Sequence, residues 1–223
     1  MKDKIKEIFI NLGADLCGVA SVDLFVNSPE GFHPKDIFSD CKSVIVFAKK
    51  IPKGLANVNP RIVYRQFNNV ALTEIDRIAY LGSNELEKIP NAIAVPIPCD
   101  NPYDYWDEEN LEGKGTLSMK HAAVLAGIGT LGKNTLLLNS KYGNMLTLGA
   151  VLTNLDLPSD PPARDICLKG CRICIDNCPG KAINENHVTQ KNCRKCAYGS
   201  NDRGLWVVNC NKCRINCPMS LGL

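Results

Sequence analysis

The 223-residue sequence contains no run of 18 apolar residues, so it predicts no helix that spans a membrane. It also has little net charge, because the formal value of +3 is too small by itself to indicate a nucleic-acid partner. The start, MKDKIKEIFI, is charged and amphipathic, which argues against an export signal and a secreted disulfide protein. We therefore expect a chain that folds in the reducing cytoplasm.

The small net charge is unevenly distributed. Residues 161–223 contain ten Lys and Arg and four Asp and Glu, a balance of +6, which leaves −3 for residues 1–160. A basic segment can bind a polyanion, but no patch of alternating basic and aromatic residues, as found in RNA-binding proteins, accompanies this charge. Anionic metal clusters held within the segment explain its positive charge better.

Cysteine is the abundant residue type. The chain has twelve cysteines, and only Cys17, Cys41 and Cys99 lie outside residues 167–217. We interpret these three as small apolar core residues. In a reducing compartment the nine clustered cysteines indicate bound metal rather than disulfides.

The first 158 residues alternate between helical and strand patterns. Apolar periodicity predicts helices over residues 2–13, 61–89 with a break near Gly82, and 116–127, and strands over 16–20, 43–48, 92–97, 136–138 and 145–153. The proline in the third strand places that strand at an edge or an end of the sheet. This alternation predicts an α/β or α+β fold in which helices cover a sheet.

Three prolines in residues 155–163 predict a domain boundary. On this basis residues 1–158 form an α/β cofactor-binding domain and residues 159–223 form a second domain. The second segment is rich in loops and poor in apolar residues, so bonds to a metal must supply much of its order.

A half-motif occurs twice in the second segment. Cys171-x2-Cys174-x3-Cys178-Pro is followed by Cys210-x2-Cys213-x3-Cys217-Pro. Bacterial two-cluster ferredoxins use the run C-x2-C-x2-C-x3-C-P, in which the fourth cysteine binds the other [4Fe–4S] cluster. The spacing is physically reasonable, because close thiolates surround one cube and the chain then turns at proline toward the next.

This pattern predicts two [4Fe–4S] clusters. The ligands of the first cluster are Cys167, Cys171, Cys174 and Cys217. The ligands of the second are Cys178, Cys193, Cys210 and Cys213, with Cys196 as the alternative to Cys193. Two features depart from the standard run: three residues separate Cys167 from Cys171, and residues 197–209 form a long insertion.

Zinc is the principal alternative metal. Cys171-x2-Cys174-x18-Cys193-x2-Cys196 fits the spacing of a zinc ribbon, which would make the segment a zinc-stabilised binding module. That interpretation leaves both Cys-Pro endings unexplained, so we favour iron–sulfur clusters.

A glycine-rich stretch, Gly127-Ile-Gly129-Thr-Leu-Gly132-Lys133-Asn134, matches the dinucleotide pattern G-x-G-x-x-G and is one residue short of a P-loop. Both motifs need a preceding strand and a following helix, and here the predicted order is reversed. We therefore discount ATP and NAD. The stretch is typical of a helix C-terminal cap, and its three glycines also allow a flat ligand to approach the backbone.

The stretch HAAVLAGIGTLGKNTLLLNSKYGNMLTLGAVLTN, followed by CRICIDNCPGKAI, resembles the epoxyqueuosine reductase family and the related corrinoid-dependent reductive dehalogenases. The resemblance covers residues 120–220 strongly and residues 1–100 weakly. It implies a nitroreductase-like α/β sandwich that holds cobalamin, joined to a two-cluster ferredoxin-like domain. By this analogy Gly127, Gly129, Gly132, Lys133 and Asn134 lie against the corrinoid.

Three features of the sequence depart from the family. Our alignment puts Gly113, next to Glu112, where the tRNA-modifying enzymes carry a catalytic aspartate. The segment RIVYRQFNN lacks their Arg-Tyr and Asp-Tyr-His signature, and no segment matches their helical-repeat domain. We therefore expect a short relative that does not act on tRNA.

The function that we predict is that of an iron–sulfur reductase whose clusters relay electrons from a redox partner to a cofactor, with a corrinoid as first choice. The substrate is a small molecule or is otherwise unknown. Two alternatives stay open: an electron-transfer or partner-binding protein without its own substrate site, and an FMN-dependent reductase.

Overall fold

The computed structural model describes residues 1–59, 61–185 and 187–223. Its centre is a four-stranded sheet in the order β1-β2-β8-β3, in which every neighbouring pair is antiparallel. The strands of this sheet are β1 (Leu16–Ser21), β2 (Ser43–Lys50), β8 (Leu146–Thr153) and β3 (Ala94–Ile97). The strand that contains Pro96 is an edge strand, as the sequence predicts.

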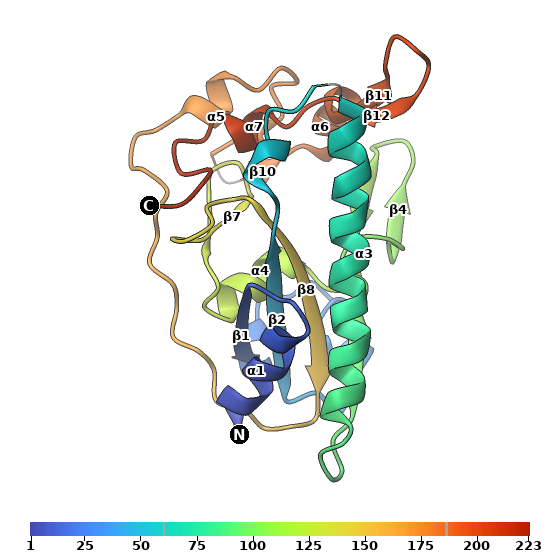
Figure 1. The fold of residues 1–223 in the computed structure, drawn as a ribbon, viewed down its shortest axis with the longest axis vertical. Coiled ribbons are helices and arrows are strands. Elements are labelled where there is room, and N and C mark those ends of the chain that lie inside the picture. The colour runs from blue at the N-terminus through green and yellow to red at the C-terminus, as the bar shows by residue number, and fades with distance from the viewer. Residues whose placement is uncertain (60, 186) are drawn as a thin grey trace.

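Helices cover both faces of the sheet, which confirms the predicted helix-covered sheet. Alternate side chains of β2 enter two different cores: Val44 and Val46 join the core beneath α4 (Met119–Leu125), whereas Ile45 and Phe47 join the core beneath α1 (Lys2–Asn11) and α3 (Arg61–Leu86). This is the period-2 alternation expected of a strand that is buried on both faces. Figure 1 shows the long helix α3 running beside the sheet.

Helix α3 continues without a break through Gly82, so the predicted break is wrong. A side chain at Gly82 would begin 2.3 Å from the ring of Phe9, which is fully buried on α1. The glycine therefore allows α1 and α3 to pack closely. Tertiary packing outweighs the modest cost of glycine in a helix interior.

The glycine-rich stretch follows α4 and precedes a short strand, in the order that the sequence predicts. Two short strands lie in this region, one within the stretch and one after it. These are β6 (Thr130–Leu131) and β7 (Leu137–Leu138). Gly127 has φ +69° and donates from its amide to Val124, which confirms a helix cap at this glycine. No phosphate-binding helix follows the glycines.

The proline-rich segment after β8 contains neither helix nor strand among residues 154–172. It lies along the first part of the chain, because the Asp160 carboxylate accepts from the Val19 amide and pairs with Lys2 and Lys6 at 2.9 and 2.8 Å. The division into domains of residues 1–158 and 159–223 stays a prediction.

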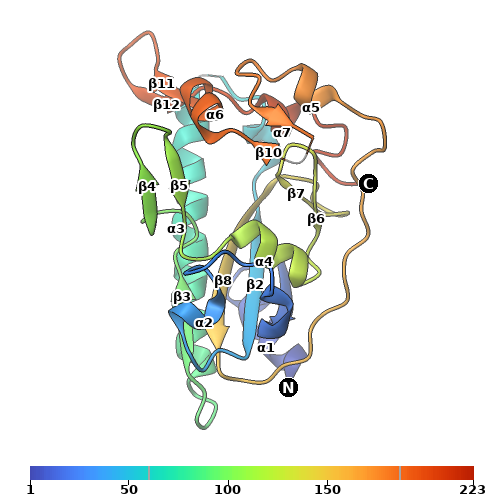
Figure 2. The same ribbon diagram turned by 180° about the vertical axis from the view of Figure 1, so that it is seen from behind.

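The cysteine-rich segment lies at the end of the molecule remote from the N-terminus (Figure 2). Its elements are α5 (Ile173–Asp176), β9 (Ile183–Asn184), β10 (His187–Val188), α6 (Gln190–Ala197), β11 (Tyr198–Ser200), β12 (Trp206–Val208) and α7 (Lys212–Ile215). The remaining elements of the chain are η1 (Val22–Phe25), α2 (Pro34–Ile37), η2 (Lys53–Leu55), β4 (Tyr105–Asp107) and β5 (Glu112–Lys114). Across the described residues, no helix combines the length and the apolar character needed to cross a membrane.

Candidate metal centre

The repeated half-motif produces a repeated local structure. In the first run the one-turn helix α5 lies between Cys171 and Cys178, and in the second run α7 lies between Cys210 and Cys217. The two short helices contact each other. Each run ends in Cys-Pro, where the ring of proline cannot continue a helix. The two runs therefore meet as similar turns of chain that bring their thiols to adjacent places.

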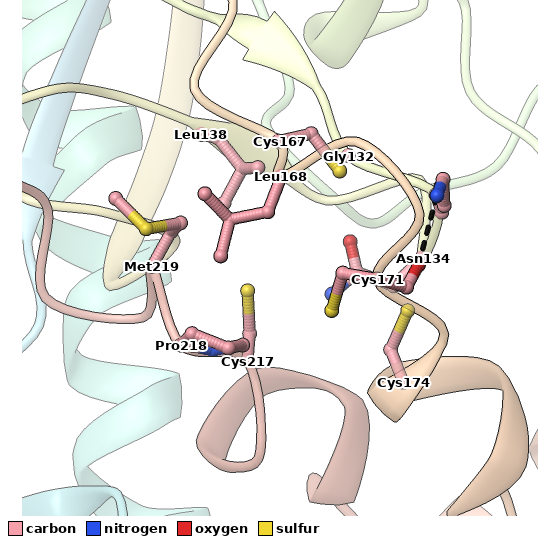
Figure 3. Close-up of a pocket in the computed structure, with 11 residues that line it drawn as sticks. Gly132, Asn134, Leu138, Cys167, Leu168, Cys171, Cys174, Cys217, Pro218 and Met219 are labelled. Carbon is pink, nitrogen blue, oxygen red and sulfur yellow. Dashed lines mark hydrogen bonds between the residues drawn. The ribbon is translucent and has the colours of Figure 1, made fainter.

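The predicted first set of thiols lines one pocket. Cys167, Cys171, Cys174 and Cys217 are all part of its wall. Three of them come from the first run and its approach, and Cys217 comes from the far end of the second run. Figure 3 shows their sulfur atoms around a common space. The structure thus brings together the four residues that the crossed ferredoxin pattern assigns to one cluster.

The pKa values of these thiols are shifted because the thiols lie close together. Burial raises the pKa of Cys174, and the thiols of Cys167 and Cys171 raise it further, because neighbouring thiolates repel each other. Burial also raises the pKa of Cys217, and the same neighbours, together with Cys174, act in the same direction. A cationic metal centre would remove this penalty by binding the thiolates.

The predicted second set is also brought together. The pKa of Cys213 is raised to about 11, mainly by burial and also by the neighbouring thiols of Cys193, Cys210 and Cys178. Burial is also the largest cause of the raised pKa of Cys193, and the neighbouring thiols of Cys178, Cys210 and Cys196 raise this pKa further. No thiol of the first set contributes to either shift, so the nine cysteines divide into two neighbourhoods.

Cys196 has a different position from Cys193. Cys196 is among the thiols that raise the pKa of Cys193, but it is not among those that raise the pKa of Cys213. Cys193, in contrast, does raise the pKa of Cys213. Its sulfur packs against the turn after the first run, 3.0 Å from the place where a side chain on Gly180 would begin. These contacts favour Cys193 as the ligand, although the choice between the two thiols stays a prediction.

A single zinc ion suits this arrangement less well than clusters do. Zinc holds each thiolate at about 2.3 Å, so its ligands must converge on one point. Within residues 1–59, 61–185 and 187–223, no three His, Cys, Asp or Glu side chains are placed to hold one metal ion. The four thiols of the first set border one pocket.

The three remaining cysteines lie elsewhere and have different surroundings. Burial raises the pKa of Cys17 to about 12 and that of Cys41 to about 11, and it also raises the pKa of Cys99 strongly. Cys41 is buried, whereas Cys17 and Cys99 are only partly buried. No other cysteine is among the causes of these three shifts, so these thiols lie apart from both sets.

The glycine-rich stretch contributes to the same pocket through its last three residues. Gly132, Lys133 and Asn134 line it together with the first set of thiols. Gly127 and Gly129 are not part of its wall. A side chain on Gly127 would begin 2.2 Å from the Pro161 carbonyl oxygen, and one on Gly129 would begin 2.3 Å from the Leu138 carbonyl oxygen. Contact of these five residues with an organic cofactor stays a prediction.

Three residues that surround Gly113 were not identified from the sequence: Tyr103, Gln190 and Arg194. Gly113, at the position that our alignment gives to the family's catalytic aspartate, exchanges two backbone hydrogen bonds with the side chain of Gln190 at 3.1 and 3.0 Å. A side chain there would begin 3.1 Å from Tyr103 and 3.2 Å from Arg194. Strand β5 is thereby tied to α6, the helix that carries Cys193. No local pattern joins residues 77 positions apart in the chain.

Other wall residues were also missed. Leu168, Pro218 and Met219 complete, together with Leu138, the apolar part of the pocket wall. The first two are next to cysteines in the sequence, and that adjacency is the signal that could have identified them.

Comparison with known proteins gives three findings. No family model matches the chain. An epoxyqueuosine reductase from Listeria monocytogenes is 27% identical over 238 residues, an alignment that covers 96% of this chain but 59% of that protein. The chain thus spans about six tenths of the length of this curated relative.

Solved structures share the fold. An epoxyqueuosine reductase crystallised with an epoxyqueuosine-modified tRNA-Tyr stem loop superposes with a TM-score of 0.69 and 19% identity, covering 98% of this chain and 65% of that one. A reductive dehalogenase, whose structure suggested a mechanism for B12-dependent dehalogenation, gives a TM-score of 0.65 and 18% identity over 97% of this chain and 31% of that one.

Proposed function

The chain resembles the epoxyqueuosine reductases in sequence and shares its fold with them, and on this basis we propose that it is an iron–sulfur reductase with two [4Fe–4S] clusters. One cluster is held by Cys167, Cys171, Cys174 and Cys217. The other is held by Cys178, Cys193, Cys210 and Cys213. The observation that carries the proposal is the pocket in which Cys217, from the second run, joins the three thiols of the first.

Thiolate is the ligand that iron–sulfur clusters use, and eight thiols in two neighbourhoods supply the donors for two cubes. The protein's own part is to hold these ligands, to limit the access of water, and to place charge near the clusters. The basic balance of residues 161–223 compensates the negative charge of two such clusters. Together these residues form a ferredoxin-like module, which is a relay for single electrons.

The clusters would relay electrons from a redox partner to a group bound by residues 1–158. A corrinoid is our first choice, because the structure of a reductive dehalogenase with this fold suggested a mechanism for B12-dependent dehalogenation. A bound corrinoid would supply a metal centre able to reduce a substrate. The side-chain positions of Gly127, Gly129 and Gly132 are filled by atoms of this chain, so internal packing already accounts for these glycines. We therefore assign no step of the reaction to the corrinoid.

One observation favours a second candidate, an electron-transfer protein without a substrate site of its own. At the position that our alignment gives to a catalytic aspartate, the chain has Gly113, and Gln190 holds that backbone by both of its hydrogen-bonding groups. A residue without a side chain can neither donate nor accept a proton for a substrate. This candidate predicts clusters and no tightly bound organic cofactor.

The test is metal analysis of the protein after anaerobic purification, cluster reconstitution, incubation with cobalamin and desalting. We expect about eight irons per chain, because each [4Fe–4S] cluster contributes four, and little zinc. One retained cobalt per chain would support the corrinoid reductase. Iron without cobalt would favour the electron-transfer protein, and yellow FMN absorbance would favour a flavin reductase. Zinc in place of iron would refute all three.

A further inference from the structure

The end of the glycine-rich stretch contacts the cysteine-rich segment directly. The Lys133 ammonium donates a hydrogen bond of 2.8 Å to the Cys171 carbonyl oxygen. The side-chain amide of the next residue, Asn134, donates one of 2.8 Å to the Cys213 carbonyl oxygen. Cys171 belongs to the first set of thiols and Cys213 to the second. Two adjacent residues thus fix the backbone of one cysteine in each set.

The environment of Asn134 makes its contact rigid. The residue is 4% exposed, and its Oδ1 atom accepts from the Leu136 amide at 3.1 Å while its nitrogen serves Cys213. Both ends of the side chain are therefore used, and the orientation of the amide is fixed. The fit also explains Gly132, because a side chain there would begin 2.9 Å from the Asn134 oxygen.

Lys133 also brings a positive charge close to the first set of thiols. Lys133 is part of the wall of the pocket that Cys167, Cys171, Cys174 and Cys217 line. A cluster with four thiolate ligands is an anion and becomes more negative when it takes up an electron. A positive charge in its wall stabilises the reduced state more than the oxidised state, and the effect is strong where water is largely excluded.

We propose that Lys133 and Asn134 are positioning residues of the iron–sulfur relay, which fix the two cluster-binding segments relative to each other, and that Lys133 raises the reduction potential of the cluster bound through Cys217. This inference rests on the proposed two-cluster function. The end of the glycine-rich stretch then has a role other than phosphate binding and helix capping, which is to hold the cluster-binding backbone. Asn134 stands where a P-loop would have Ser or Thr, and it binds a peptide carbonyl rather than a metal ion.

The test is a redox titration of the reconstituted protein, followed by electron paramagnetic resonance, with iron determined on each sample. Lys133→Met removes the charge and the donor, whereas Lys133→Arg keeps both. Lys169→Met is the matched control, because Lys169 lies in the loop between Cys167 and Cys171, is exposed, and has no hydrogen bond to the cluster-binding backbone among the described contacts. Solvent screens the charge of such an exposed lysine.

For Lys133→Met we expect one cluster to become harder to reduce, by about tenfold in the equilibrium constant, which is about 59 mV for one electron. The other cluster should keep its potential, Lys133→Arg should restore the first, and Lys169→Met should leave both unchanged. Asn134→Ala should lower the iron content or alter the magnetic coupling between the clusters, since it releases the backbone at Cys213.

Several outcomes would overturn the proposal. Eight irons with unchanged potentials in Lys133→Met and unchanged coupling in Asn134→Ala would refute it and leave the two-cluster function intact. Loss of iron from Lys133→Met alone would support the positioning role, whereas equal loss from Lys169→Met would show general fragility and refute it. Fewer than eight irons in the unaltered protein would instead refute the proposed function.

Discussion

Residues 1–158 and residues 159–223 obtain their order in different ways. The first part buries large side chains such as Phe9, Phe47 and Ile75 completely, in two cores on opposite faces of one sheet. Among the described residues, the second part has only short helices and two-stranded pairs, and its buried apolar residues are few and include no aromatic ring. They are Ile166, Cys174, Ala182, Ile183, Val207 and Met219.

The difference shows where each part must find its stability. A packed core compensates for the loss of chain entropy through the burial of apolar surface. A segment of loops and one-turn helices cannot do this, and small domains of this kind commonly depend on bonds to metal. The second part is also held by hydrogen bonds from the first, which Lys133, Asn134 and Asn144 donate. The side chain of Asn144 donates to the Arg214 carbonyl oxygen.

Removal of the clusters is the strongest way to test this contrast. We expect chelation of iron to abolish most amide protection in residues 167–217, because the ligand bonds that order them are gone. Strands β2 and β8 should keep their protection, since their cores involve no metal. Hydrogen exchange measured by mass spectrometry, before and after chelation, gives the answer. Equal loss of protection in both parts would show that the two fold as one unit.

Substitution of a single cysteine distinguishes the two proposed clusters of the second part. Cys217→Ser should reduce the iron content from about eight to about four per chain, because the crossed arrangement makes this residue a ligand of the cluster held by Cys171 and Cys174. Cys99→Ser is the control, since this thiol belongs to neither set and should leave the iron unchanged. Iron analysis and cluster spectra measure both variants. Full iron and unaltered spectra in Cys217→Ser would contradict the assignment.

The reverse perturbation acts on the first part. Phe9→Ala removes a fully buried ring that stacks on Phe47 with centroids 5.0 Å apart. We expect the free energy of unfolding to fall by about 3–5 kcal/mol, the usual cost of deleting a buried aromatic ring. Urea denaturation followed by circular dichroism measures the change. At low urea the iron content should stay the same, and a parallel loss of iron would mean that the cores and clusters are coupled.

Much of the fold could be predicted from the sequence because it depends on local patterns. The β-branched run in residues 43–48 and the proline of β3 gave the central and the edge strand correctly. The break at Gly82 was wrong, because the need for that glycine comes from Phe9, which is distant in the chain. Periodicity reports which face of an element is buried but not which residue packs against it.

The candidate site shows the same division. The spacing of the two Cys-Pro runs predicted which thiols would share a neighbourhood, because that spacing reflects the geometry of the ligands themselves. The role of Lys133 and Asn134 toward the backbone of Cys171 and Cys213 could not be predicted in this way. A hydrogen bond to a peptide carbonyl leaves no mark in the sequence of the acceptor, since every residue carries one.

The smallest expected effect concerns the segment that joins the two parts. Burial raises the pKa of Asp160, but hydrogen bonds from Lys6 and Lys2 and from the Val19 amide lower it more, so the net pKa lies below its usual range. A carboxyl with a depressed folded-state pKa stabilises the fold above its unfolded pKa of about 3.9, and this stabilisation disappears as the pH falls through the lower folded value. We expect Asp160→Asn to cost about 0.5–1 kcal/mol near pH 7, the range of a partly exposed ion pair, and less as the pH falls below the unfolded pKa. Urea denaturation of the cluster-free protein from pH 7 to pH 3 measures the difference. A cost that does not change over this range would mean that Asp160 acts through its shape rather than its charge.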